Sequence, residues 1–176
     1  MANRDALREF QSRLASRLQE ARAAGGAASW LAVYAQGAGY LFPLNHAGEI
    51  FPWAAPQRVP HAQPWFAGVV NLRGGISGVV DLGAFISGGE SAPRNELQQA
   101  QSRLVSLNEA LGVNCALLVD RLAGLKGVES FVESSDPPAD APPYFGHRYT
   151  DEQGTSWQEI NLQSLALFPA FLSISA

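Results

Sequence analysis

Glycine and proline interrupt this chain so often that only short elements can form between them. The 176 residues include 17 Gly and 11 Pro, and 47% of all residues are hydrophobic. Short apolar segments separated by turn residues are typical of β-strands, whereas a helical bundle needs longer periodic segments. The sequence therefore predicts a mainly β protein, and its length is sufficient to bury a core.

Composition excludes several classes of function. A net charge of −4 gives no sign of the basic surface that nucleic acid requires, so we expect no nucleic-acid partner. No apolar run reaches the roughly 20 residues of a membrane-spanning helix, which predicts no direct membrane insertion. Cys115 is the single cysteine, so a disulfide framework is excluded and a cytoplasmic location is the simplest expectation.

Residues 3–24 predict a helix that extends from the β domain. Their apolar side chains recur at spacings of three and four, and Gly25 and Gly26 follow as a helix end. The segment contains five Arg and three acidic residues, a net charge of +2, which leaves −6 for the remainder. This helix, within an extension of residues 1–26, either packs on the β domain or docks on a partner. Its apolar positions are Leu7, Phe10, Leu14, Leu18 and Ala21.

A similar order of elements occurs twice in residues 27–176. Each half begins with two strands around a tight turn, continues through a proline-rich connection to another hairpin, and ends in a short apolar segment. The second hairpin of the first half is expected to turn at Gly74 and Gly75. This repeat predicts two related small barrels of about five strands each, joined by a polar, mobile linker at residues 87–100. The expected strands are residues 30–35, 40–45, 47–53, 69–73, 76–81, 103–108, 113–120, 122–131, 144–149 and 155–160, and the apolar segments are residues 82–86 and 161–167.

Enzyme and metal-site signatures are incomplete in this sequence. His46, His61 and His147 are scattered at spacings that do not match a metal site. Cys115 lies on the inward face of an apolar strand, in the alternating series Val113, Cys115, Leu117 and Val119, as a core residue does. Ser77 follows a glycine at the spacing of a nucleophile elbow, but the second glycine of that motif is missing. A small hydrolase using Ser77 or Cys115 is a minor alternative, and we expect no catalytic residue, cofactor or metal.

Residues 58–74 read R-V-P-H-A-Q-P-W-F-A-G-V-V-N-L-R-G and strongly resemble the signature of CheW-like domains. Those domains carry an R-I-P-x-A-x-P stretch, then G-V-I-N-L-R-G, then an apolar strand that ends in V-D-L. Residues 80–82 supply V-D-L at the expected distance, and residues 48–50 and 118–122 resemble two further elements of the family. These matches follow one another in the family's order.

The N-terminal extension and the segment Phe51-Pro52-Trp53 more closely resemble the pilus-associated PilI branch of this family. The resemblance implies two intertwined SH3-like five-stranded β-barrel subdomains without an active site or cofactor. It also implies a cytoplasmic adaptor, recruited to membrane-associated receptor arrays, that couples the cytoplasmic tip of methyl-accepting chemoreceptors to the regulatory domain of a CheA-type histidine kinase. The output would include twitching motility driven by type IV pili. A generic SH3-like interaction module unrelated to chemosensing is the alternative.

The turn at Arg73 and Gly74 is the predicted centre of a partner-binding surface. Arg73 precedes two glycines, so its guanidinium is expected to project from a tight turn where a bidentate partner can be met. Glu49 is either the intramolecular ion-pair partner of Arg73 or a second polar contact. Ile50 and Val69 supply apolar contact or belong to the core. The complete predicted receptor- or kinase-binding set is Glu49, Ile50, Val69, Asn71, Arg73 and Gly74.

Overall fold

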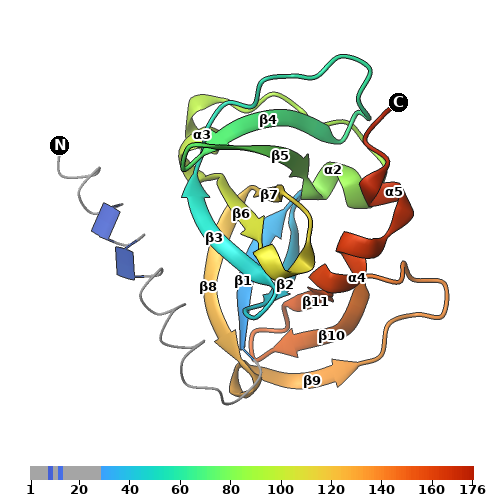
Figure 1. The fold of residues 1–176 in the computed structure, drawn as a ribbon. Helices are drawn as coiled ribbons and strands as arrows, with labels where there is room; N and C mark the ends of the chain where they lie inside the picture. The colour runs from blue at the N-terminus through green and yellow to red at the C-terminus, as the bar shows by residue number, and fades with distance from the viewer. Residues whose placement is uncertain (1–7, 10–11, 14–28) are drawn as a thin grey trace.

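The computed structural model describes residues 8–9, 12–13 and 29–176. The predicted N-terminal helix lies outside the described residues, apart from helical residues 8–9 and 12–13, where Arg13 pairs with Glu9 at 3.1 Å. Residues 29–176 form two curved β-sheets with short helices packed between them at one side (Figure 1). The prediction of a mainly β fold is confirmed. No helix in the described part of the chain is both long and apolar enough to cross a membrane.

The first sheet has six strands in the order β8-β1-β2-β11-β10-β9. Its first hairpin was predicted, but the turn has only two residues, whose φ angles are both positive (48° and 77°), so the second strand begins two residues earlier than expected. The strands of this sheet are β1 (Ser29–Ala35), β2 (Ala38–Pro43), β8 (Arg121–Gly127), β9 (Phe131–Ser135), β10 (Phe145–Asp151) and β11 (Ser156–Ile160).

The second sheet has five strands in the order β3-β6-β7-β5-β4. Its β4–β5 hairpin turns at Arg73 and Gly74, one residue earlier than predicted, because Leu72 pairs with Gly75 and leaves two residues for the turn. The strands of this sheet are β3 (Ala47–Pro52), β4 (Phe66–Leu72), β5 (Gly75–Asp81), β6 (Arg103–Leu107) and β7 (Cys115–Val119).

The two sheets exchange strands between the two halves of the sequence. The hairpin β1–β2 joins the second half, because β2 pairs in parallel with β11, and the hairpin β6–β7 joins the first half through the parallel pair β5–β7. Each sheet is open, with different strands at its two ends, and does not close into a barrel. The architecture is that of two SH3-like subdomains that share their strands.

Packing follows this arrangement, with one shared core and a smaller core on the other face of each sheet. Strand β7 is buried on both faces: Cys115, Leu117 and Val119 point into the shared core, whereas Ala116 and Leu118 pack in the second sheet's own core. The alternation predicted for this strand is therefore correct, although its other face is not solvent-exposed. The six-stranded sheet has a separate core that includes Trp30 and Trp157.

The two short apolar segments at the ends of the halves both form helices. Asp81 Oδ1 accepts a hydrogen bond from the backbone N–H of Ala84 at the start of α2 (Leu82–Ser87). Asn161 Oδ1 does the same for Ser164 at the start of α4 (Leu162–Leu167), which α5 (Pro169–Leu172) follows. These matching N-caps confirm the predicted equivalence of the two segments.

Residues 87–100, which were predicted to be a mobile linker, contain regular structure. Its last residues form most of α3 (Glu96–Gln101), whose start has a reciprocal capping box between Asn95 and Gln98. Arg94 fixes the segment further by binding two carboxylates. The 3₁₀ turns η1 (Glu109–Leu111) and η2 (Val128–Ser130) complete the fold, and η2 divides the single strand predicted at residues 122–131.

Candidate functional site

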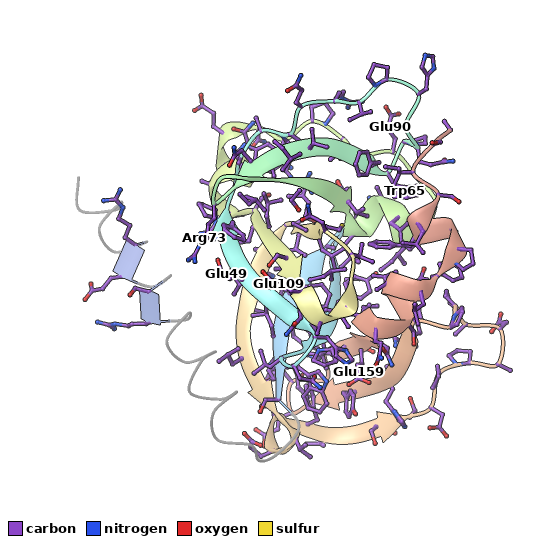
Figure 2. All side chains as sticks on the ribbon, in the orientation of Figure 1. Glu49, Trp65, Arg73, Glu90, Glu109 and Glu159 are labelled. Atoms are coloured by element: carbon purple, nitrogen blue, oxygen red, sulfur yellow. The ribbon has the colours of Figure 1, made fainter. Side chains whose placement is uncertain are left out.

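Arg73 and Glu49 meet where the two end strands of the five-stranded sheet approach each other. Arg73 Nε lies 2.9 Å from Glu49 Oε2, and the side chains are 75% and 47% exposed. Arg73 belongs to the β4–β5 turn and Glu49 to β3, and Figure 2 shows the two side chains next to each other at the edge of the molecule. The predicted ion pair is present, but its exposure limits its contribution to stability to about 0–1 kcal/mol.

The β4–β5 turn holds Arg73 in a defined position. Arg73 and Gly74 have φ angles of 50° and 79°, the left-handed conformation that a two-residue hairpin turn requires. Asn71 Oδ1 accepts a hydrogen bond from the backbone N–H of Gly74 at 2.9 Å, which fixes the turn from inside. Asn71 and Gly74 therefore have identifiable structural roles, namely to present the Arg73 side chain.

Glu49 is held by a side chain rather than by a regular strand ladder. The pairing of β3 with β6 is irregular between Ala47 and Ile50. At this irregularity the backbone N–H of Glu49 donates to Ser106 Oγ at 2.7 Å, and the Ser106 hydroxyl donates to the Glu49 carbonyl at 3.3 Å. Both members of the ion pair are thus anchored to the sheet before any partner binds.

Two open hollows lie beside the ion pair. The larger, of about 600 Å³, extends from Arg73 and Ile76 to Glu109 and Asn114 in the turn before β7. Ile76 is 60% exposed and was not among the predicted residues. The sequence signal that could have identified Ile76 is its position as an apolar residue at the tip of a hairpin. It lies on the opposite face of β5 from the buried residue Ser77.

The smaller hollow, of about 330 Å³, brings most of the predicted set together. Ile50, Asn71, Glu49 and Arg73 line it together with apolar side chains of β3 and β4 that the prediction did not include. These additional apolar residues are Phe51, Trp53 and Leu72. The hollow thus combines one exposed ion pair with a largely apolar wall.

Val69 lies apart from this hollow. Its backbone N–H and C=O exchange hydrogen bonds with Gln57, at 2.9 and 2.8 Å, so this part of the β4 edge is already paired. Val69 and Ile50 also pack against the shared core. Val69 therefore belongs to the core, the second of the two roles considered, whereas Ile50 both packs on the core and lines the hollow.

Ser77 and Cys115 lie close together in the larger hollow but lack the features of a catalytic pair. Both are almost fully buried, and β5 pairs with β7 at this point through Gly78 and Cys115. Burial raises the pKa of the Cys115 thiol to about 12, so the reactive thiolate is scarce at neutral pH. None of the described residues that line this hollow is a histidine, so neither residue has a histidine base there.

The histidines of the described residues do not form a metal site. No group of three His, Cys, Asp or Glu side chains is close enough there to hold a metal ion. His147 Nε2 lies 3.0 Å from Asp136 Oδ1 at the surface. Burial lowers the pKa of His46, which favours its neutral form.

The strand order and the shared core define the class of protein, which is a mainly β protein of two SH3-like subdomains. Residues 29–166 match the family described as the CheW-like domain. The chain therefore belongs to the CheW-like family of coupling proteins, in its PilI branch.

Individual relatives support this placement. The chain is 28% identical over 140 residues to the protein PilI of Pseudomonas aeruginosa, covering 77% of this chain and 74% of that protein. A shorter match of 43 residues, 40% identical, links 24% of the chain to 28% of the chemotaxis protein CheW of Bacillus subtilis. The crystal structure of the scaffolding protein TtCheW from Thermoanaerobacter tengcongensis superimposes with a TM-score of 0.61 at 17% identity, over 77% of this chain and 89% of that one. The last comparison shows the shared fold.

Proposed function

We propose that this protein is a non-catalytic adaptor that couples methyl-accepting chemoreceptors to a CheA-type histidine kinase. Membership of the CheW-like family supports a scaffolding role, and the similarity to the protein PilI supports an output in type IV pilus motility. The adaptor acts in the cytoplasm, where it is recruited to receptor arrays at the membrane. Its partners are the receptor's cytoplasmic tip and the kinase's regulatory domain.

The observation that carries this proposal is the anchored, exposed Arg73–Glu49 pair with a hollow on each side, the smaller of which is lined mostly by apolar residues. A guanidinium that is 75% exposed can bind a partner carboxylate while its own backbone stays fixed. An anchored arginine beside apolar pockets is the combination that most often carries binding energy at protein interfaces. The apolar face of a helical receptor hairpin fits such a surface, and a carboxylate on it would meet the Arg73 guanidinium.

Single substitutions of Arg73 and Glu49 test this proposal. Arg73→Ala should weaken binding of the receptor's cytoplasmic tip by roughly tenfold or more, because a central arginine of an interface typically contributes above 1 kcal/mol. Stability should change by only about 0–1 kcal/mol, since the intramolecular pair is exposed. Isothermal titration calorimetry and urea unfolding measure the two quantities on the same variants.

Arg58→Ala is the matched control, because Arg58 is another exposed arginine on the connection between β3 and β4. Glu49→Ala shows whether the receptor binds the ion pair or the Arg73 guanidinium alone. If Arg73→Ala binds the receptor tip normally, or unfolds near room temperature, then Arg73 has a purely structural role and this assignment of the surface is wrong.

A further inference from the structure

The end of the β4–β5 hairpin extends beyond the strands that support the rest of it. Strand β7 pairs with β5 only from Gly78 onward, and on the other side Gln57 bonds the edge of β4 at Val69. Residues 71–76, which we call the hairpin end, therefore pair as strands only with each other within the described part of the chain. This hairpin end carries Arg73, so whatever fixes it also fixes the predicted centre of the partner-binding surface.

Two polar side chains from outside the hairpin tie its end to the sheet in the part of the chain that the structure describes. On the β4 side, Glu49 forms the ion pair with Arg73. On the β5 side, Asn114 Nδ2 donates a hydrogen bond to the backbone C=O of Ile76 at 2.5 Å. Asn114 lies directly before β7, and its own carbonyl accepts a hydrogen bond from the backbone N–H of Gly78 at 3.3 Å. The Asn114 side chain thus extends to the hairpin end the support that β7 gives to β5.

The two ties respond differently to a bound partner. A partner carboxylate that binds the Arg73 guanidinium competes with Glu49, because both anions seek the same N–H groups. The Asn114 tie ends on a backbone carbonyl, so a charged partner leaves it in place. Leu72 adds apolar contact, but it is only partly buried against the core of the second sheet. Asn114 is therefore the polar tie that keeps Arg73 in position while a partner is bound.

We propose that Asn114 is a positioning residue of the partner-binding surface. Its side chain holds the hairpin end through the backbone of Ile76, and thereby places the side chains of Arg73 and Ile76 for the partner. This role rests on the proposed function only for the identity of the partner. Asn114 lies outside the segments that resemble the family signature, so its role follows from the structure and not from that resemblance.

Hydrogen exchange of the protein alone tests the hold on the hairpin end. In Asn114→Ala, the backbone amides of residues 71–76 should exchange roughly three- to tenfold faster, which is the factor that one hydrogen bond typically contributes. Asn114→Asp keeps the size of the side chain, but a carboxylate cannot donate, so it should act in the same direction. The amides of β6 and β7 should keep their wild-type rates. Unchanged exchange at the hairpin end in both variants would overturn the proposal.

Asn161→Ala is the matched control. Asn161 also bonds to the backbone of another residue, Ser164, at the start of α4, which lies on the other side of the molecule from the β4–β5 turn (Figure 1). This variant loses a helix cap, but its hairpin end should exchange at the wild-type rate. Equally fast exchange of residues 71–76 in Asn161→Ala would indicate a general loss of stability and would overturn the specific role of Asn114.

Binding of the receptor's cytoplasmic tip, measured by calorimetry, tests the positioning role. Asn114→Ala should weaken binding by roughly threefold or more in the wild-type background, and by clearly less when Arg73→Ala is already present, because it acts partly through Arg73. Fully additive losses would mean that Asn114 contacts the receptor directly, which would overturn the positioning role. If the wild type does not bind the receptor tip but the exchange result holds, the proposed function fails while the hold of Asn114 on the hairpin end stands.

Discussion

At the scale of single residues, carboxylates fix both buried tryptophans of the six-stranded sheet. Trp30 Nε1 donates a hydrogen bond to Glu159, and Trp157 Nε1 donates to Asp151 Oδ2 at 2.9 Å. These contacts give each indole N–H the partner that a buried polar group requires. The Trp30–Glu159 contact joins residues 129 positions apart, so no local pattern in the sequence could have revealed it.

Asp151 makes stability depend on pH. The hydrogen bond from Trp157 lowers the pKa of this carboxyl, and backbone N–H groups of Thr155 and Gln153 act in the same direction, although desolvation opposes them. Because the folded pKa lies below the ordinary value of 3.8, stabilisation is complete above that value and is lost as pH falls through the folded pKa. Thermal unfolding between pH 7 and pH 2 should show this acid-dependent loss.

Asp151→Asn keeps the size of the side chain but removes the titrating group. The variant should be less stable than the wild type at pH 7, and the difference should narrow as the pH falls. Parallel stability curves for the two proteins over the whole range would show that Asp151 does not titrate as described.

At the scale of elements, the β4–β5 hairpin explains two glycines of the family signature. Gly68 has a φ angle of 134°, and a Cβ atom there would overlap the backbone carbonyl of Gln57, which pairs with Val69. Gly74 has a φ angle of 79°, but a Cβ atom there would point into open space. The first glycine is required by close backbone approach and the second by backbone conformation alone.

Alanine substitutions should separate these two requirements. Gly74→Ala should cost about 1–2 kcal/mol, which is the usual price of a left-handed conformation for a residue with a side chain. Gly68→Ala should cost clearly more, because it must also displace the backbone of Gln57. Urea unfolding of both variants measures the difference, and equal losses would contradict the close approach at Gly68.

Most strands could be predicted because alternating apolar residues and glycine turns mark them. Strand β9 was missed because the predicted strand 122–131 stops at its first residue, and the polar residues that follow resemble the start of the proline-rich connection. Helix α3 was missed because four of its six residues are polar and none of the six is buried, so it has no apolar periodicity. The capping pair Asn95 and Gln98 was the available local signal.

At the scale of the whole molecule, Arg94 ties the two sheets together. Its guanidinium, 10% exposed, lies 3.2 Å from Asp81 at the end of β5 and 2.8 Å from Asp120 between β7 and β8. Asp120 also accepts a hydrogen bond from the backbone of Gln36, in the β1–β2 turn of the other sheet, at 2.7 Å. Ser91 donates a hydrogen bond to Asp81 at 3.0 Å and completes the network.

Arg94→Ala should therefore destabilise the protein strongly. Removing the guanidinium leaves the buried Asp81 carboxylate without its cation, and breaking a buried pair in this way typically costs about 3–5 kcal/mol. The exposed Arg58→Ala should change the free energy of unfolding by less than about 1 kcal/mol. If urea unfolding shows similar small effects for both variants, Arg94 does not hold the sheets together.

The exchange of strands between the halves was expected only from the family resemblance, which implies intertwined subdomains, because no pattern in the residues themselves indicates which strands exchange. The parallel pairs β2–β11 and β5–β7 join distant parts of the chain, and the repeat of elements fits separate barrels equally well. The Arg73–Glu49 pair could be predicted because the family signature places both residues. Ile76 and Trp53 could not be predicted, because only the three-dimensional arrangement shows which residues line the hollows beside this pair.

The most direct test of the coupling function is binding to the kinase. The full-length protein should co-elute in size-exclusion chromatography with the regulatory domain of the CheA-type kinase from the same organism. With Arg73→Ala alongside, the same experiment shows whether the β4–β5 turn serves the kinase or is left for the receptor. A complex with the wild-type protein is the result that the adaptor function predicts. The absence of a complex at tens of micromolar would contradict it and would favour a generic interaction module.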